Sequence, residues 1–201
     1  MTDAVEIVSD LVKIPSVSPF GRNETERRER FERCREVLAY LEEFLQKQGA
    51  QTEQLVFEGG HDKWWYPVPN LYAELTIGDR KAAGHKFLCY MGHIDVVPVG
   101  EEKLWRRPPF SGQIDEGFVW GRGATDMKGS VGAWMSALEE LKAGKGVGVN
   151  LTIGTLITGD EEWAAVNGRD KGLAWMKANG KNPDAFIVGE PSSRDYLGTH
   201  I

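Results

Sequence analysis

Leu156-Ile157-Thr158-Gly159-Asp160-Glu161-Glu162 is an apolar run that ends in three consecutive acids. In residues 151–157 apolar residues alternate with others, and several side chains are β-branched. This pattern predicts a strand with the acids at its C-terminal end. Open α/β sheets bind their ligands at the carboxyl ends of their strands. Three neighbouring carboxylates repel one another unless a cation or a raised pKa relieves the repulsion. The first turn of a helix also accepts such acids, so the stretch alone leaves a ligand site and a solvated helix cap open.

The composition is that of a globular domain. The chain has 201 residues, of which 41% are hydrophobic and 27% are charged, enough for one domain with a small appendage. A net charge of −6 argues against nucleic acid as a partner, and no apolar run approaches the ~18 residues of a membrane span. Residues 1–10 contain acids and no basic segment, so they do not resemble a signal peptide. Cys34 and Cys89 belong to no Cys-x-x-Cys pattern, which predicts free thiols and a cytoplasmic protein.

Patterns typical of helices and of strands alternate along the chain. Apolar residues at helical spacing predict helices, and alternating or continuous apolar runs predict strands. The predicted helices span residues 3–13, 23–48, 130–141 and 173–178, the first with Thr2 as its cap. The predicted strands span residues 51–57, 70–77, 86–91, 151–157 and 185–188, the last of them buried, with a hairpin over 113–120. This order predicts an α/β fold with a mixed, mostly parallel sheet flanked by helices.

The helix predicted for residues 23–48 has one apolar side and one highly charged side. Its first half, residues 24–35, interleaves arginine with glutamate. Such arginines could contact nucleic acid, but neighbouring charges of both signs favour a solvated, ion-paired face. The buried side is predicted to consist of Phe31, Val37, Leu38, Leu41, Phe44 and Leu45.

Potential metal ligands follow three of the predicted strands. These ligands are His93, Glu161 with Glu162, and Glu190. Asp126 lies in the glycine-rich segment between the first and second of these strands. The carboxyl ends of parallel strands meet at one edge of a sheet, so side chains far apart in the sequence can converge there. One histidine with several carboxylates suits a borderline cation such as Zn²⁺, with Co²⁺ or Mn²⁺ as alternatives.

Each of these residues also has a purely structural interpretation. A single histidine after a strand is more often structural than a ligand. Asp126 could cap the following helix, and Glu190 before Pro191 could be a turn residue. Asp95 stands two residues after His93, and its carboxylate could support the imidazole as carboxylates near metal sites do. It is the joint placement of these residues that favours a site.

Two further motifs have weaker claims to a ligand. His61 beside Asp62 lies in an aromatic-rich loop and could bind a metal, although a surface histidine is the commoner case. Gly121-Arg122-Gly123 could belong to a phosphate loop, but it lacks the Gly-Lys-Ser/Thr ending of that motif. Neither motif is therefore assigned a site.

Taken together, these segments resemble a known family, the dinuclear-zinc amidohydrolases that include aminoacylase, acetylornithine deacetylase, carboxypeptidase G and succinyl-diaminopimelate desuccinylase. The resemblance runs in the family's order from Ile7 to Leu197. It rests on five motifs: Gly92-His93-Ile94-Asp95-Val96-Val97-Pro98, Trp105 with Pro108-Pro109-Phe110, Gly121-Arg122-Gly123-Ala124-Thr125-Asp126-Met127-Lys128-Gly129, Asp160-Glu161-Glu162 and Gly189-Glu190-Pro191. Val166-Asn167-Gly168 and Gly189-Glu190-Pro191-Ser192-Ser193 look most like the desuccinylase branch.

The resemblance implies a site for two Zn²⁺ ions, for which Co²⁺ could substitute. Asp126 would bridge the two ions. His93 and Glu190 would complete the first ion, and Glu162 would bind the second. Zinc lowers the pKa of bound water towards neutrality and polarises an amide carbonyl, which is the chemistry that amide hydrolysis requires.

The resemblance also implies two catalytic acids. Glu161 matches the general base that takes a proton from the attacking water and passes it to the leaving amine. Asp95 matches the acid that orients His93. Asp160 receives no role from the resemblance and is expected to be a turn or capping residue.

The implied activity is hydrolysis of N-succinyl-L,L-2,6-diaminopimelate to succinate and L,L-diaminopimelate, a step of lysine and diaminopimelate biosynthesis. An acetylornithine deacetylase-like enzyme, another N-acyl-amino-acid deacylase or a dipeptidase is the alternative. A non-catalytic metal-binding interaction module is a third interpretation, which Glu161 disfavours because a binder needs no base. The expected partner is a small N-acyl amino acid, with no nucleic acid and no membrane.

Members of this family are longer than the chain. They insert a lid or dimerisation domain after the region that matches Glu190, and then return with a distal histidine that completes the second ion. Residues 1–201 are therefore expected to be the N-terminal part of the catalytic domain without the lid, and His200 does not match that distal histidine. We expect little or no desuccinylase activity from these residues alone, and no homodimer of the kind that full-length relatives form.

Overall fold

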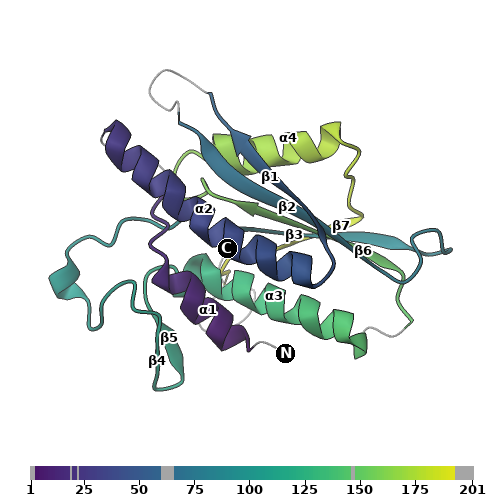
Figure 1. The fold of residues 1–201 in the computed structure, drawn as a ribbon, viewed down its shortest axis with the longest axis horizontal. Coiled ribbons are helices and arrows are strands. Elements are labelled where there is room, and N and C mark those ends of the chain that lie inside the picture. Colours follow the sequence, from purple (N-terminus) through teal and green to yellow (C-terminus); the bar gives the residue numbers. More distant parts are fainter. Residues whose placement is uncertain (1–2, 19, 22, 60–65, 146–147, 193–201) are drawn as a thin grey trace.

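The computed structural model describes residues 3–18, 20–21, 23–59, 66–145 and 148–192. A five-stranded sheet lies between two layers of helices, and a two-stranded hairpin projects from them (Figure 1). The helices are α1 (Ala4–Lys13), α2 (Glu24–Lys47), α3 (Gly129–Glu140) and α4 (Lys171–Ala178). The strands are β1 (Gln51–Phe57), β2 (Val68–Ile77), β3 (Lys86–His93), β4 (Gln113–Asp115), β5 (Phe118–Trp120), β6 (Leu151–Thr158) and β7 (Ala185–Val188).

The order of the strands in the sheet is β1-β2-β6-β3-β7. Strand β3 pairs in parallel with both β6 and β7, whereas β2 is antiparallel to β1 and to β6. Four of the five strands therefore point the same way, and β2 alone among them is reversed. The predicted α/β fold with a mixed, mostly parallel sheet is confirmed. This topology brings the carboxyl ends of β3, β6 and β7 to one edge of the sheet.

Alternate residues of each strand face opposite layers of helices. Leu71 and Ala73 of β2 pack into the larger core with residues of α1, α2 and α3, whereas Tyr72 between them packs into a smaller core with Met176 of α4. Figure 1 shows α1, α2 and α3 together on one side of the sheet. Because side chains alternate with period two in a strand, the apolar residues of one strand serve both cores.

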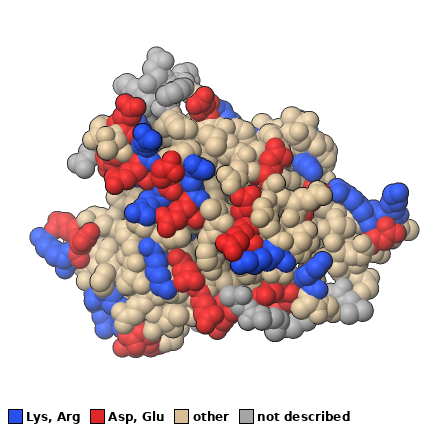
Figure 2. Space-filling model, viewed as in Figure 1, with Lys and Arg blue, Asp and Glu red and all other residues tan. Residues whose placement is uncertain are grey.

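Helix α2 has the two sides that its sequence predicts. Its buried residues are Cys34, Val37, Leu38, Leu41 and Leu45, while Phe31 and Phe44 are partly buried. The charged side forms the ion pairs Arg30–Glu26, Arg33–Glu36 and Arg35–Glu32 within the helix. In Figure 2 acidic and basic side chains are intermixed over this region, as an ion-paired face requires. None of the helices in the described ranges combines the length and the apolar character that a bilayer crossing requires.

Some predicted details of the elements differ from the structure. The N-cap of α1 is Asp3, whose side chain accepts a hydrogen bond from the Val5 N–H at 3.0 Å, and Thr2 lies outside the described residues. Strand β2 begins before Pro69, a residue that disfavours a strand assignment from sequence. Strand β3 extends to His93, so this histidine is the last residue of the strand.

The prediction that residues 185–188 form a buried strand is wrong in its burial. All four residues of β7 are exposed, because β7 lies at an edge of the sheet and pairs only with β3 among the described strands. The apolar residues of β7 are therefore not covered by any other part of the chain that the structure describes.

Candidate metal centre

Three neighbouring strands deliver the candidate ligands to one edge of the sheet. His93 is opposite Thr158 in the pairing of β3 with β6, so Glu161 and Glu162 begin three residues beyond it. Glu190 follows β7, whose last residue is opposite Met91. The convergence follows from the parallel register, as the sequence predicts.

Asp126 reaches the same place from the turn Ala124–Lys128 between β5 and α3. Its backbone is not helical, and the peptide bond that links it to Met127 is cis. Helix α3 has no side-chain cap, so the alternative that Asp126 caps this helix does not hold. The carboxylate instead faces His93.

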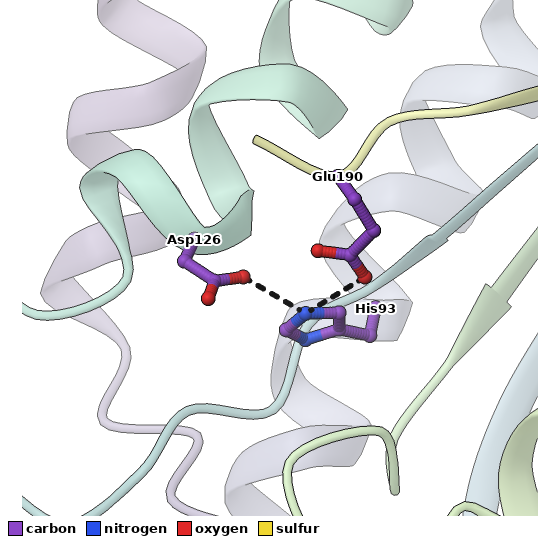
Figure 3. A group of neighbouring side chains, drawn as sticks. All are labelled: His93, Asp126 and Glu190. Carbon is purple, nitrogen blue, oxygen red and sulfur yellow. Dashed lines mark hydrogen bonds and ion pairs between the residues drawn. The ribbon is translucent and has the colours of Figure 1, made fainter. Parts of the chain in front are cut away.

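The imidazole of His93 is the centre of the cluster. Its Nε2 lies 3.1 Å from Asp126 Oδ1, 3.5 Å from Glu190 Oε1 and 3.7 Å from Glu161 Oε2. Figure 3 shows the His93, Asp126 and Glu190 side chains directed towards one another, and their ligand atoms lie within 4.8 Å of each other. His93 is only 1% exposed, whereas the three carboxylates are 38–50% exposed. A buried nitrogen thus faces a partly open ring of oxygens.

The orientation of His93 is set by its own neighbours in the chain. Its Nδ1 lies 2.9 Å from the backbone carbonyl oxygen of Asp95, and its backbone N–H donates to Met127 Sδ at 3.3 Å. A carbonyl oxygen can only accept, so Nδ1 carries a proton, and the neutral form of the ring would present the lone pair of Nε2 to the acids. A lone pair and carboxylate oxygens repel one another unless a proton or a cation lies between them. This donor set fits a borderline divalent cation.

Asp95 supports the site in a different way from the one its spacing suggested. Its carboxylate accepts the backbone N–H groups of Glu161 at 3.0 Å and of Glu162 at 3.1 Å. The hydrogen bond to the His93 ring comes from its main chain, and its Oδ1 stays 3.6 Å from Nδ1. Asp95 is fully buried, and these hydrogen bonds tie the end of β3 to the acidic turn that follows β6.

Burial and mutual repulsion make the cluster favour positive charge. Burial alone would lower the pKa of His93, but the charges of Asp95, Glu190 and Glu161 outweigh burial and raise it. Burial raises the pKa of Asp95 to about 6, against the opposing effect of the His93 charge. The pKa of Glu190 is raised by burial and by the neighbouring acids. Negative charge is therefore under-compensated here, which a bound cation would correct.

Glu162 lies near this group, since the charges of Asp126, His93, Asp95 and Glu161 all act on it. It is absent from the ligand group that the described residues form around His93. Burial raises the pKa of Glu162, and the charge of Asp126 raises it further.

A cavity of about 120 Å³ opens beside the cluster, and among its lining residues are His93, Glu161, Glu190 and Arg169. This volume has room for a few water molecules or a small part of a substrate. Arg169 gave no signal in the sequence; it lies in the short π-helical turn Val166–Asp170 before α4.

The sequence missed other residues that build the site. Asp160 was expected to be a turn or capping residue, and its carboxylate does accept the Asn167 backbone N–H at 3.3 Å. It is also fully buried and accepts a hydrogen bond from the Tyr66 hydroxyl at 2.7 Å, which the sequence did not indicate. Lys128 is also fully buried, and its ammonium donates to the carbonyls of Leu11 and Ile14 at 2.8 Å each, which fixes the end of α1 beside the turn of Asp126. His61, Asp62 and His200 lie outside the described residues.

The fold and the site together are those of an α/β protein with a candidate site for a divalent metal ion at the carboxyl ends of its parallel strands. A sequence model of peptidase family M20/M25/M40 matches residues 89–200, more than half of the chain. The chain belongs to this family, and the resemblance drawn from its five motifs is confirmed. The family uses divalent metal ions, and it includes a solved metallo-carboxypeptidase.

Curated relatives carry the name of the branch that the motifs indicated. Succinyl-diaminopimelate desuccinylase of Xanthobacter autotrophicus is 36% identical over 96% of this chain and 44% of its own length. The same-named protein of Methylocella silvestris is 36% identical over 98% of this chain and 45% of its own length. The chain thus spans less than half the length of these relatives.

Solved structures share the fold. An M20 family metallo-carboxypeptidase from Sulfolobus solfataricus superposes with a TM-score of 0.72 at 26% identity, covering 96% of this chain and 38% of that one. Human carnosine dipeptidase 1 gives a TM-score of 0.76 at 24% identity, covering 94% of this chain and 38% of that one. The second likeness supports the fold alone.

Proposed function

We propose that this chain carries the metal-binding part of a hydrolase that cleaves the amide bond of N-acyl amino acids. The observation that carries the proposal is the convergence of Asp126, Glu190 and Glu161 on Nε2 of His93. The substrate that we propose is N-succinyl-L,L-2,6-diaminopimelate, with succinate and L,L-diaminopimelate as products. Its support is the name shared by curated relatives at 34–36% identity.

The proposed metal ligands divide into two groups that share Asp126. His93 and Glu190 would hold a first Zn²⁺ together with Asp126, and Glu162 would hold a second. Co²⁺, which accepts the same nitrogen and oxygen ligands, is the expected substitute. The bound ions would supply Lewis-acid polarisation of the amide carbonyl and a more acidic water.

Glu161 is the proposed general base. Its carboxylate lines the cavity beside His93, and its backbone N–H is held by Asp95. From this position it can accept the proton of the attacking water and deliver it to the nitrogen of the leaving amine. Asp95 would act as a positioning residue, because it holds Glu161 and Glu162 by their main chain and His93 by its ring nitrogen.

The test compares zinc binding with hydrolysis. Calorimetric titration of the metal-free chain with Zn²⁺ should show tight binding that His93→Ala abolishes and that Glu161→Gln and a Glu53→Gln control on β1 retain. In protein that hydrolyses N-succinyl-diaminopimelate, Glu161→Gln should remove turnover while the metal stays bound. Zinc binding that survives His93→Ala would refute the site. Faster hydrolysis of N-acetylornithine or of a dipeptide than of the succinyl substrate would refute the proposed substrate.

A further inference from the structure

Asp160 opens the acidic turn after β6 and differs from the two glutamates that follow it. Its side chain is fully buried, whereas the Glu161 side chain is 38% exposed. Within the described residues it does not belong to the ligand group around His93. A buried ionised carboxylate is stable only if donors satisfy its oxygens, so the partners of Asp160 show what it holds in place.

Both carboxylate oxygens of Asp160 have donors. The Tyr66 hydroxyl donates to Oδ1 at 2.7 Å, and the Asn167 backbone N–H donates to Oδ2 at 3.3 Å. The backbone N–H groups of Ala164 and Ala165 also stabilise its charged form. The carboxylate therefore closes the loop of residues 160–167 on itself, and this loop contains both glutamates of the site.

The donors of Asp160 are themselves fixed to the sheet. The side-chain amide of Asn167 donates to the Tyr66 carbonyl at 3.0 Å, and the side-chain amide of Asn70 donates to the Asn167 carbonyl at 3.0 Å. Asn70 belongs to β2, which is the neighbour of β6. The network thus ties the far end of the loop to a second strand, so the loop cannot shift without breaking buried hydrogen bonds.

The backbone of the loop is held in an unfavourable conformation. Ala165 has a φ of +55°, in the left-handed region that residues with a Cβ rarely adopt. The Asp170 N–H donates to the Ala165 carbonyl at 3.1 Å and stabilises this turn. Such a conformation persists only where the surroundings enforce it, and it is commonest at functional sites.

The near end of the same loop is held by Asp95. Its carboxylate accepts hydrogen bonds from the backbone N–H groups of Glu161 and Glu162. Further along the loop, the Asp160 carboxylate accepts one from the N–H of Asn167. The main chain that carries both glutamates therefore runs between two fully buried carboxylates.

We propose that Asp160 is a positioning residue, which with Tyr66 fixes the backbone from which Glu161 and Glu162 reach the metal centre. The proposal rests on the proposed function of those two glutamates. Loss of the Tyr66 hydroxyl frees one oxygen of Asp160 and loosens the loop. Metal ligands must keep their distances within about 0.2 Å, so a loosened loop weakens metal binding through Glu162.

The chain offers a matched control for removing this hydroxyl. Tyr72 is 3% exposed, as is Tyr66, and its hydroxyl donates to the Glu74 carboxylate at 3.0 Å. Tyr72 packs in the smaller core with Met176 of α4. Tyr66→Phe and Tyr72→Phe each remove one buried bond from tyrosine to carboxylate, but only the first touches the acidic loop.

The experiment compares these variants by two readouts. The first is the hydrogen exchange of the Glu161 and Glu162 amides in the metal-free chain. The second is the affinity for Co²⁺, measured by calorimetry and by the visible absorption of the bound ion. Tyr66→Phe should speed the exchange and weaken Co²⁺ binding by about tenfold relative to Tyr72→Phe, with a larger effect of Asp160→Asn in the same direction.

The outcomes separate the two proposals. If Tyr66→Phe matches Tyr72→Phe in both readouts, Asp160 stabilises the fold without positioning the glutamates, and the inference is overturned. It is also overturned if the exchange rises while the Co²⁺ affinity stays at the wild-type value. If the wild type binds no Co²⁺, the proposed function fails, and the exchange comparison alone decides whether Asp160 fixes the glutamate backbone.

Discussion

Gly189 is the residue whose replacement tests the packing behind the metal centre most directly. It links β7 to Glu190, and its N–H donates to the Met91 carbonyl at 3.1 Å. A Cβ added to it would lie less than 3.0 Å from the hydroxyls of Ser130 and Tyr90 and from the Met127 methyl group. Those hydroxyls are hydrogen-bonded to each other at 2.8 Å, so neither moves freely.

Gly189→Ala should therefore displace the backbone that carries Glu190. An ordinary contact of a Cβ is 3.4–4 Å, so relief of the clash requires a shift of several tenths of an ångström or more. Overpacking of this kind costs roughly 1–3 kcal/mol of stability. The same shift exceeds the ~0.2 Å tolerance of a metal ligand, so zinc affinity should fall about tenfold or more. Urea unfolding of the metal-free chain measures the first effect, and calorimetric titration with Zn²⁺ measures the second.

A second substitution separates steric displacement from other causes. Ser130→Ala removes the closest of the clashing atoms, so the double variant with Gly189→Ala should recover part of both losses. Ser130→Ala alone should keep zinc affinity within about twofold of the wild type, because the Ser130 hydroxyl is hydrogen-bonded to Tyr90 and not to a residue of the ligand group that the described residues form. Gly189→Ala protein with wild-type stability and wild-type zinc affinity would refute the steric argument.

Three further outcomes are expected. Leu156→Ala, which opens a cavity in the smaller core, should lower the free energy of unfolding by about 2–5 kcal/mol in urea, whereas exposed Leu104→Ala should change it by less than about 0.5 kcal/mol. Lys128→Met should lower it by about 1–3 kcal/mol in the same assay, because two carbonyls at the end of α1 lose a charged donor; an unchanged midpoint would count against this bond. Zn²⁺ at 100 times its Kd should stabilise the chain by about 2.7 kcal/mol in thermal unfolding, and both EDTA and His93→Ala should remove the gain.

Much of the fold follows from local patterns in the sequence. The alternating residues of Leu151–Thr158 predict a strand, and the parallel pairing of this strand with Lys86–His93 follows from the intervening helix. Once three parallel strands are assigned, the meeting of His93 and Glu190 at one edge follows from geometry. The ligand group around His93 was therefore accessible from spacing and topology.

Other features depend on contacts that no local pattern encodes. The apolar sequence of Ala185–Val188 suggested burial, yet its exposure is decided by which elements lie against it. Asp160 belongs to a run of three acids, and only the position of Tyr66 across the fold makes it a buried acceptor. The support of His93 by the backbone of Asp95 cannot be foreseen either, because a main-chain carbonyl leaves no mark on the sequence.

The exposed position of β7 bears on how a metal ion would be held. Strand β7 pairs with β3 through four residues, and its exposed side chains bury little apolar surface. Segments of this kind open locally at low free energy. An ion bound by both the buried His93 and the partly exposed Glu190 would link β7, the outermost strand, to the end of β3. Metal binding and the local opening of β7 would then be coupled, so the protection of the β7 amides from hydrogen exchange should rise with metal concentration.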